Sequence, residues 1–226
     1  MKNLNWRALA CGAAMSLAAA MPAVAGVVDF EDVLPNLFGT GDTFASGGYQ
    51  FATTGFFGQV DTAAGAFFGA PNGSDGQYYT GANDSSLTMT TGSTNLLRLA
   101  GFSFAYATPV PVNGGPFSAG MLVAMGIDDA GGAVQQTWDF GTNAANGQWD
   151  FMTLGVGSMG AVGVGLRSVT FLACLYDGMG GCTNPAGNQA QFAIDNIRDL
   201  PEPASLALVV AALGLIGVSR RKQQSI

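Results

Sequence analysis

The stretch "LAGFSFAYA", residues Leu99–Ala107, decides the fold class of this chain. Aromatic rings stand at every second position, Phe102, Phe104 and Tyr106, so the three rings share one face of an extended strand. Further along, "GIDDAGGAVQQTW" places Asp128–Gly132, a cluster of Asp and Gly, between two runs that suit strands, which predicts a β-hairpin. Both patterns indicate strands that bury one face.

Similar short runs recur along the chain, and turn signals rich in Gly, Asn and Pro separate them. We predict strands in "VVDFEDV" (27–33), "GYQFATTG" (48–55), "SSLTMTT" (85–91), "MLVAMGI" (121–127), "AVQQTWDF" (133–140), "QWDFMTLG" (148–155), "SVTFLACLY" (168–176) and "QFAIDNIRDL" (191–200). In "VGSMGAVGVGLRS" (156–168), the frequent Gly residues argue against a regular helix. The pattern predicts an all-β domain at residues 26–200, a β-sandwich of the jelly-roll or lectin-like type.

The first 25 residues have the three parts of a secretory signal peptide. Lys2 and Arg7 form a positive start, Ala8–Met21 is almost entirely apolar, and Ala23 and Ala25 put small residues where a signal peptidase reads them. We therefore predict a signal peptide over residues 1–25, cut by signal peptidase after Ala25.

The chain closes on "LPEPASLALVVAALGLIGVSRRKQQSI", residues 200–226. As a helix, the uncharged run Ala204–Val218 covers ~22 Å, which is short of the ~30 Å hydrocarbon core of a bilayer. A buried core helix is the alternative. However, the basic residues Arg220, Arg221 and Lys222 directly after the run fit a cytoplasmic stop under the positive-inside rule. We predict a C-terminal single transmembrane helix.

This tail is similar to a known sorting signal. Pro201-Glu202-Pro203, the apolar run and the basic end together resemble the PEP-CTERM signal of Gram-negative bacteria, over residues 201–226. The resemblance implies processing by a membrane-embedded exosortase. It also implies a precursor held in the inner membrane, sorting to the cell surface or extracellular matrix, and association with exopolysaccharide and biofilm.

The domain between the two signals is strongly acidic. Of the cations in the chain, only Arg98, Arg167 and Arg198 lie in residues 26–200, against fourteen acids, so its net charge is near 3 − 14 = −11. This charge argues against nucleic acid or anionic lipid as a partner, because both bind cationic surfaces. It favours cations, Ca²⁺ above all.

The chain contains no His, which excludes Ser-His-Asp and Cys-His catalysis and His-ligated zinc. The domain keeps two cysteines, Cys174 and Cys182, in "CLYDGMGGC". In an exported protein with a Gly-rich loop between them, a disulfide is the expected state. A metal-thiolate pair is the alternative, although two Cys without His make a poor metal site.

The two ends of the domain carry a second resemblance. The opening "VVDFEDV" and the closing "QFAIDNIRDL" resemble the first and last strands of exported lectin-like, carbohydrate-binding and MAM-like modules. This resemblance implies that the terminal strands run side by side and that Asp29, Glu31 and Asp195 contribute to a structural Ca²⁺ site. Strand alternation puts Asp29 and Glu31 on one face, with Phe30 and Asp32 on the other. The alternative is that these acids are solvated or cap a turn.

Two further groups could bind ligands. "PNGSDGQYYTGANDSS" (71–86) offers Asp75, Asn83 and Asp84 to a second cation or a sugar, but it also fits a plain surface loop rich in turns. Aromatic residues could stack on sugars or simply fill the core. The candidates are Trp138, Trp149, Tyr78 and Tyr79, with Phe56-Phe57 and Phe67-Phe68 in the aromatic loop at residues 54–81.

The sequence therefore predicts an exported, non-enzymatic protein with a structural or adhesive role in the cell envelope or biofilm matrix. A lectin-like module that binds exopolysaccharide is the first alternative. A carboxylate-dependent glycoside hydrolase is the second, and it is disfavoured because Glu31 is the one Glu of the domain and lies on the opening strand.

Overall fold

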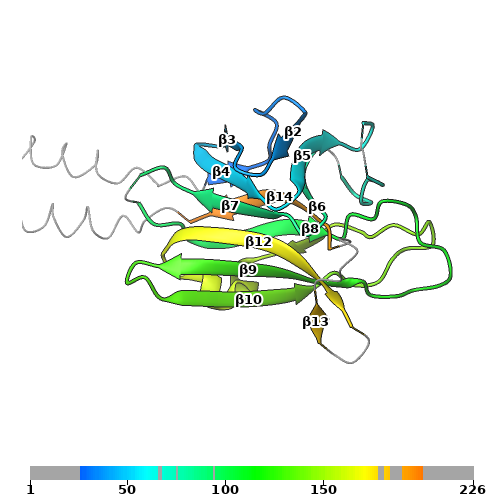
Figure 1. Cartoon of the computed structure of the whole chain (residues 1–226). Helices are drawn as coiled ribbons and strands as arrows, with labels where there is room; N and C mark the ends of the chain where they lie inside the picture. Colours follow the sequence, from blue (N-terminus) through cyan, green and yellow to red (C-terminus); the bar gives the residue numbers. More distant parts are fainter. Residues whose placement is uncertain are drawn as a thin grey trace, which may run out of the picture. The chain divides into compact units, whose positions relative to one another are not determined.

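The described residues form two antiparallel β-sheets that share one hydrophobic core (Figure 1). The computed structural model describes residues 26–65, 68–74, 76–93, 95–177, 181–183 and 190–200. This is the all-β sandwich that the sequence predicts.

The first sheet, sheet A, has the order β11-β8-β14-β6-β5-β2, and β1 also pairs with β14. Its strands are β11 (Met152–Leu154), β8 (Leu99–Ala105), β14 (Phe192–Asp199), β6 (Gln77–Ala82), β5 (Phe57–Thr62), β2 (Asn36–Gly39) and β1 (Gly26–Val28). Sheet B has the order β10-β9-β12-β7-β4-β3, and β13 also pairs with β12. Its strands are β10 (Ala133–Asp139), β9 (Gly120–Asp128), β12 (Leu166–Tyr176), β7 (Ser86–Thr90), β4 (Tyr49–Thr54), β3 (Thr43–Ser46) and β13 (Cys182–Thr183).

Eight of these strands pair in a nested order. β6 pairs with β14, β7 with β12, β8 with β11, and β9 with β10. The first four strands of the set thus pair with the last four in reverse, and successive strands alternate between the sheets except at the β9–β10 hairpin. β2 to β5 extend the two sheets beyond β6 and β7, and β1 pairs with β14.

The core contains strand β8, which is buried along its whole length. Its Phe102 and Phe104 both lie against Trp138 of β10, with ring centroids 5.1 and 6.5 Å away, which confirms the shared face predicted for them. Phe102 meets Phe171 of β12 in the other sheet, with ring centroids 5.3 Å apart and the rings edge to face. Burying a side chain of this size stabilises the fold by roughly 1.5–3 kcal/mol, so these contacts hold the two sheets together.

The β9–β10 hairpin is confirmed, with Ala133 opposite Ile127. The Asp128 carboxylate accepts the Gly132 amide at 2.6 Å, and Gly131 has φ 86°, in the left-handed region that Gly adopts without strain. The turn chemistry therefore fixes the register of the strands.

The aromatic loop expected at residues 54–81 instead contains two strands, β5 and β6. Every residue of β6 is buried, so the strand lacks the alternation that reveals a half-exposed strand. Gly81 lies directly over the Phe192 ring, and a Cβ there would collide with the ring. The backbone of β6 can approach the ring this closely only because residue 81 is Gly. In a sequence, Gly inside a run argues against a strand, so the prediction missed β6.

Residues 156–168 contain no regular α-helix, as predicted; the chain forms two short 3-10 turns, Val156–Ser158 and Gly160–Gly163, before β12 begins. The predicted signal peptide, with Ala23 and Ala25, and the predicted sorting tail, with Pro201, Glu202, Pro203, Arg220, Arg221 and Lys222, lie outside the described residues. Within the described ranges, no helix is long and apolar enough to cross a membrane.

Candidate functional site

The terminal strands lie side by side, as the resemblance at the domain ends implied. β1 pairs antiparallel with β14, with Val28 opposite Ile197. The strand prediction for residues 27–33 is wrong beyond Val28, because the chain turns at Asp29–Asp32. Phe30 has φ 57° and is fully buried, with its ring 5.5 Å from that of Phe51. Burial of this ring requires the chain to turn at Phe30, so the strand ends at Val28. Asp29 and Glu31 therefore do not share a strand face.

The three acids proposed for calcium each serve a local N–H group. The Asp29 carboxylate accepts the Glu31 amide at 3.3 Å. Glu31 accepts the backbone amide of Gln77 at 2.6 Å and its side-chain amide at 3.4 Å, which ties the opening turn to the start of β6. Asp195, 6% exposed, accepts the backbone amide of Asn196 at 2.6 Å and its side-chain amide at 2.9 Å. Among the described residues, no three acidic or cysteine side chains gather into a metal-binding group. A shared calcium ion at these positions stays a prediction.

The same use of carboxylates recurs through the domain: most described acids accept a backbone N–H. Besides Asp29, Glu31 and Asp195, they are Asp32, Asp42, Asp61, Asp128, Asp139, Asp177 and Asp199. At Asp32, the Ser46 hydroxyl and then the Gly47 amide lower the pKa of the carboxyl below its usual range. The acidic composition therefore serves turns and loops as well as the surface.

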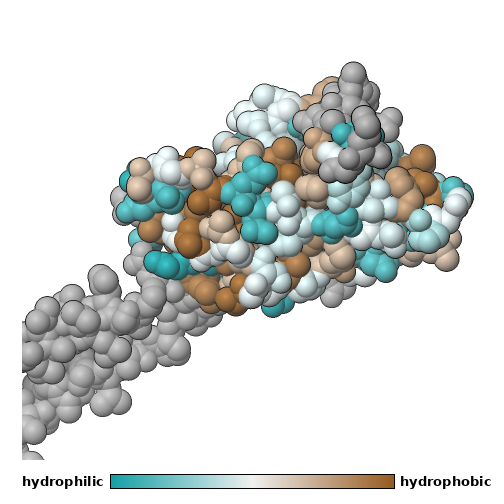
Figure 2. All heavy atoms as spheres, turned by 90° about the horizontal axis from the view of Figure 1, so that it is seen from below, coloured by the Kyte–Doolittle hydropathy of each residue, from teal (hydrophilic) through white to brown (hydrophobic). Residues whose placement is uncertain are grey.

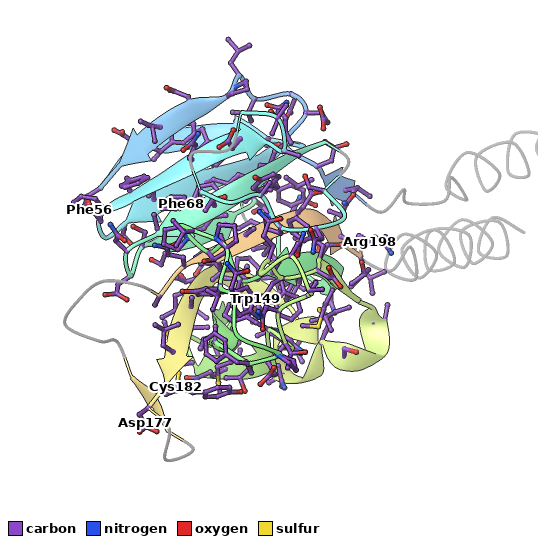
Figure 3. The ribbon with its side chains drawn as sticks, turned by 90° about the vertical axis from the view of Figure 1, so that its right-hand side faces the viewer. Phe56, Phe68, Trp149, Asp177, Cys182 and Arg198 are labelled. Atoms are coloured by element: carbon purple, nitrogen blue, oxygen red, sulfur yellow. A yellow bond between two sulfur atoms is a disulfide. The ribbon has the colours of Figure 1, made fainter. Side chains whose placement is uncertain are left out.

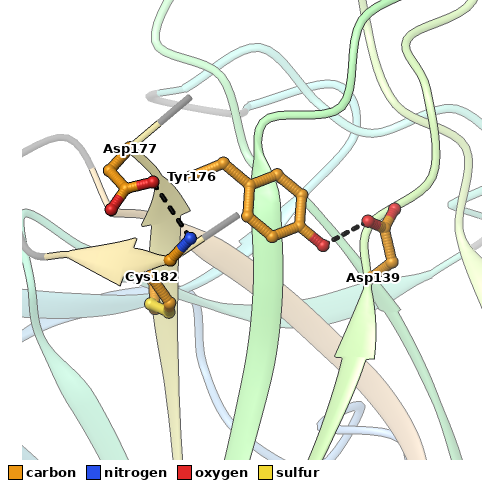
Figure 4. The surroundings of a disulfide bond; sticks show 6 residues. Asp139, Tyr176, Asp177 and Cys182 are labelled. Atoms are coloured by element: carbon orange, nitrogen blue, oxygen red, sulfur yellow. Dashed lines mark hydrogen bonds between the residues drawn. A yellow bond between two sulfur atoms is a disulfide. The ribbon is translucent and has the colours of Figure 1, made fainter. Parts of the chain in front are cut away.

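Cys174 and Cys182 form a disulfide in the structure, with their Cα atoms 5.6 Å apart, and link β12 to β13 (Figure 4). Beside it, the Tyr176 hydroxyl donates to Asp139, which also accepts the Ser118 hydroxyl at 3.1 Å. The hydrogen bond to Asp139, together with burial, raises the pKa of Tyr176 to about 12. Tyr176 therefore stays protonated at neutral pH, which suits a structural tie between β10 and β12.

We expect the Cys174→Ser/Cys182→Ser double variant to lose roughly 2–3 kcal/mol of unfolding free energy, because the bond closes a short loop and so restricts the unfolded chain. Urea unfolding of the full chain measures the difference. Wild-type protein under reducing conditions serves as the control and should match the variant. Two free thiols in oxidised, exported protein, detected by mass spectrometry, would contradict the bond.

The four aromatic residues proposed to stack on sugars lie in the core or against it. Trp149 and Tyr79 are fully buried and Tyr78 is 2% exposed, while Trp138 is half-buried and its indole N–H donates to the Ser158 carbonyl at 3.0 Å. A buried ring offers no face to a sugar, so the core-filling alternative is correct for Trp149, Tyr78 and Tyr79.

Among the described residues, the most exposed aromatic side chain lies instead in the turn between β4 and β5. Phe56 is 60% exposed, and its ring centroid lies 5.2 Å from that of Phe57, which in turn stacks on Phe68 at 5.9 Å. In Figure 3, Phe56 and Phe68 lie toward one side of the domain, whereas the buried Trp149 lies nearer its middle. We call Phe56, Phe57 and Phe68 the aromatic patch.

The outer face of sheet B is a further candidate binding surface, and it was not predicted from the sequence. Its outward residues alternate with core residues such as Phe171 and Leu122. They are Gln50, Ala52, Thr54, Ser86, Thr88, Thr90, Met121, Val123, Met125, Ile127, Ala133, Gln135, Thr137, Asp139, Ser168, Thr170 and Leu172. Asp139, at the end of β10, is the one charged residue among them, and it accepts the Tyr176 hydroxyl. We call this surface the hydroxyl face.

Neighbouring strands align the hydroxyl groups of this face. Thr88 and Thr170 are hydrogen-bonded across β7 and β12 at 2.9 Å, and Thr54 bonds Ser86 across β4 and β7 at 2.6 Å. Met125 and Ile127 remain 42% and 40% exposed. In another view of the domain, hydrophilic and hydrophobic residues are interspersed in small patches (Figure 2). Methyl and hydroxyl groups thus cover most of this face of an otherwise anionic domain, and the one carboxylate, Asp139, lies at its β10 end.

Fold and surface together define an all-β sandwich with two antiparallel sheets. No protein-family model matches the chain, and no curated protein matches it. Among solved structures, the chain is similar to the crystal structure of a DUF4465 family protein from Bacteroides caccae ATCC 43185. The two share 15% identity with a TM-score of 0.46, over 79% of this chain and 100% of that chain. At that identity and score, the likeness carries no argument about function.

Proposed function

We propose that this chain is an exported, non-enzymatic protein of the cell envelope or biofilm matrix, and that its sandwich adheres to uncharged matrix polysaccharide through the hydroxyl face. The observation that carries the proposal is the outer face of sheet B, where the strand alternation places a single charged residue, Asp139 at the end of β10, on a domain whose net charge is near 3 − 14 = −11. A surface of methyl and hydroxyl groups can cover the faces of a neutral sugar chain and bond its hydroxyls. It avoids the cost of burying a charge.

The nested strand pairing supports the jelly-roll type of sandwich for this domain. A chain that folds back on itself and then rolls up produces pairs of first with last and second with second-last, which is the order of β6 to β14. The roll leaves sheet B with a broad outer face.

The use of the carboxylates supports a non-enzymatic role. Hydrolysis of a glycoside needs two carboxylates free to act as acid, base or nucleophile across a cleft. Most described acids instead accept backbone N–H groups. The one Glu of the domain, Glu31, accepts hydrogen bonds from both the backbone amide and the side-chain amide of Gln77.

Export and sorting rest on the two ends of the sequence. A signal peptide over residues 1–25 sends the chain through signal peptidase. The tail at 201–226 holds it in the inner membrane until an exosortase sorts it to the cell surface or matrix.

We expect Thr170→Asp to lower retention of the protein on an insoluble neutral exopolysaccharide on the order of tenfold or more, because a charge in the middle of the contact loses its water without gaining a partner. Thr170 lies on the central strand of the face, opposite Thr88 and Met125. A co-sedimentation assay measures the retained fraction. Ala145→Asp, at an exposed turn position, is the matched control and should bind like wild type.

If Thr170→Asp folds and binds like Ala145→Asp, the hydroxyl face is not adhesive. The lectin-like alternative then gains from the exposure of Phe56 in the aromatic patch. In the same assay Phe56→Ser would lose binding, while Leu34→Ser, at a position 85% exposed, would keep it. Release of soluble sugar by wild type would instead support the hydrolase alternative.

A further inference from the structure

Buried oxygen atoms without hydrogen-bond partners gather at the corner where β6 passes to β7. They are Asp84 Oδ1, Ser85 Oγ and Gln191 Oε1. Ser85 is fully buried and Gln191 is 2% exposed. Buried polar atoms in folded proteins nearly always have a partner, so oxygens such as these indicate a bound group that satisfies them.

The turn from Ala82 to Ser85 is tightly fixed. The Ser85 amide donates to the Ala82 carbonyl at 3.0 Å, and Asn83 and Asp84 have φ of 52° and 62°, which Asn and Asp tolerate better than other side chains. Gly55 covers the turn, since a Cβ there would lie 2.7 Å from Ser85 Cα. The corner is therefore closed by the backbone of the β4–β5 turn.

Two hydrogen bonds tie this turn to the start of β14. The Asp84 amide donates to the Ala190 carbonyl at 3.0 Å, and the Gln191 side-chain amide donates to Asn83 Oδ1 at 3.3 Å. The second bond brings the head of the Gln191 side chain to the turn that carries Asp84. Its free oxygen, Oε1, belongs to the same amide group.

The corner has negative charge without a counter-charge. Asp84 has no cationic partner among the described residues, where the ion pair is Arg167–Asp129. A cation bound at this corner would supply the counter-charge that the described residues do not.

The donor set consists of oxygens alone: a carboxylate, a side-chain amide and a hydroxyl. Hard divalent cations bind such oxygens, and Ca²⁺ accepts irregular geometry at ~2.3–2.6 Å whereas Mg²⁺ demands a near-ideal octahedron. A single carboxylate predicts weak affinity, on the order of 10⁻⁴–10⁻³ M, as in other extracellular modules.

We propose that Asp84, Ser85 and Gln191 form a Ca²⁺ site at the β6–β7 corner. The site is separate from the acids Asp29, Glu31 and Asp195 at the domain ends, and it does not depend on the adhesive role of the hydroxyl face. Its occupation ties the β6–β7 turn to the start of β14.

The test is thermal unfolding of the purified full chain in EDTA and in CaCl₂. At a Ca²⁺ concentration tenfold above Kd, we expect the Tm of wild type to rise by about 3–6 °C. Asp84→Asn keeps the left-handed turn but removes the charge, so it should lose this shift. In EDTA it should unfold at or above the wild-type Tm, because the uncompensated charge is gone. Gln191→Leu should lose the Ca²⁺ shift as well.

Asp129→Asn is the matched control, since it removes one carboxylate at an exposed hairpin and should keep the full Ca²⁺ shift. Three results would overturn the proposal. The first is a wild-type Tm that does not respond to CaCl₂. The second is an unchanged shift in Asp84→Asn together with its loss in Glu31→Gln, which places the ion at the domain ends. The third is an equal shift with MgCl₂ in all variants, which indicates general screening of the acidic surface.

Discussion

We expect Trp149→Ala to lower the free energy of unfolding by about 3–5 kcal/mol, the usual cost of deleting a fully buried large aromatic side chain. Its ring meets Tyr106 edge to face with centroids 4.8 Å apart, and Phe117 at 5.7 Å. Its indole N–H donates to the Gly141 carbonyl at 3.2 Å, so the variant also leaves that acceptor without its partner. Trp149 therefore closes the end of the sandwich where β8 leaves the sheet.

Differential scanning calorimetry of the full chain checks this as a fall in Tm of about 6–20 °C. Trp138→Ala is the control, because Trp138 is only half-buried and should cost less. A sugar-stacking role predicts the opposite pattern, in which Trp149→Ala keeps its Tm and loses polysaccharide binding. An unchanged Tm would show that the ring is not part of the core.

Strands rich in β-branched and aromatic residues and bounded by turn signals were predictable. β8, β9, β10, β12 and β14 all lie within or close to the predicted segments. In β9 and β10, the hairpin residues Asp128–Gly132 supply both the local turn chemistry and the register. For these elements, local pattern and tertiary packing agree.

β5, β6 and the early end of β1 were not predictable. β6 is buried on both faces and contains a Gly that makes room for the Phe192 ring, and β5 contains Gly58 against the Tyr79 side chain. β1 stops early because Phe30 turns inward to meet Phe51. In each case, contacts between residues far apart in sequence override the local preference.

The candidate sites also depend on contacts between residues far apart in the sequence. The acids at the domain ends could be named from sequence, but not their use as acceptors for N–H groups such as that of Gln77. The hydroxyl face needs five strands in register, and its members from Gln50 to Leu172 are a surface only after pairing. The orphan oxygen of Gln191 depends on its meeting Asn83, more than a hundred residues earlier in the chain.

The second large effect concerns the tail after Leu200. The domain end is firmly held: Asp199 is buried and accepts the Tyr49 hydroxyl at 2.7 Å, and the Leu200 amide donates to the Arg98 carbonyl at 2.8 Å. Pro201-Glu202-Pro203 follows directly, and Pro lacks an amide and restricts the residue before it, so a helix cannot extend backward through the triplet. We therefore expect a membrane protease to act there, between the end of β14 and the predicted membrane helix.

We therefore expect two tail variants to fail in different ways. Deleting Leu206–Val218 should release the whole protein, unsorted, into the periplasm or medium, because no apolar run is left to hold it. Replacing Pro201–Pro203 with Ala should leave the full-length chain in the inner membrane, because the processing signal is lost. Cell fractionation and the mass of the exported form measure both outcomes.

Pro109→Ala/Pro111→Ala is the matched control, since it removes two prolines from an exposed loop of the exported domain and leaves the tail intact. It should reach the same place as wild type in the same processed form. The two tail variants separate anchoring from processing, because one removes the apolar run and the other removes the residues before it. If both variants reach the wild-type location with the wild-type mass, the tail is neither the anchor nor the signal. If Pro201–Pro203→Ala alone behaves like wild type, the apolar run is a plain anchor, and the exosortase proposal fails while export itself stands.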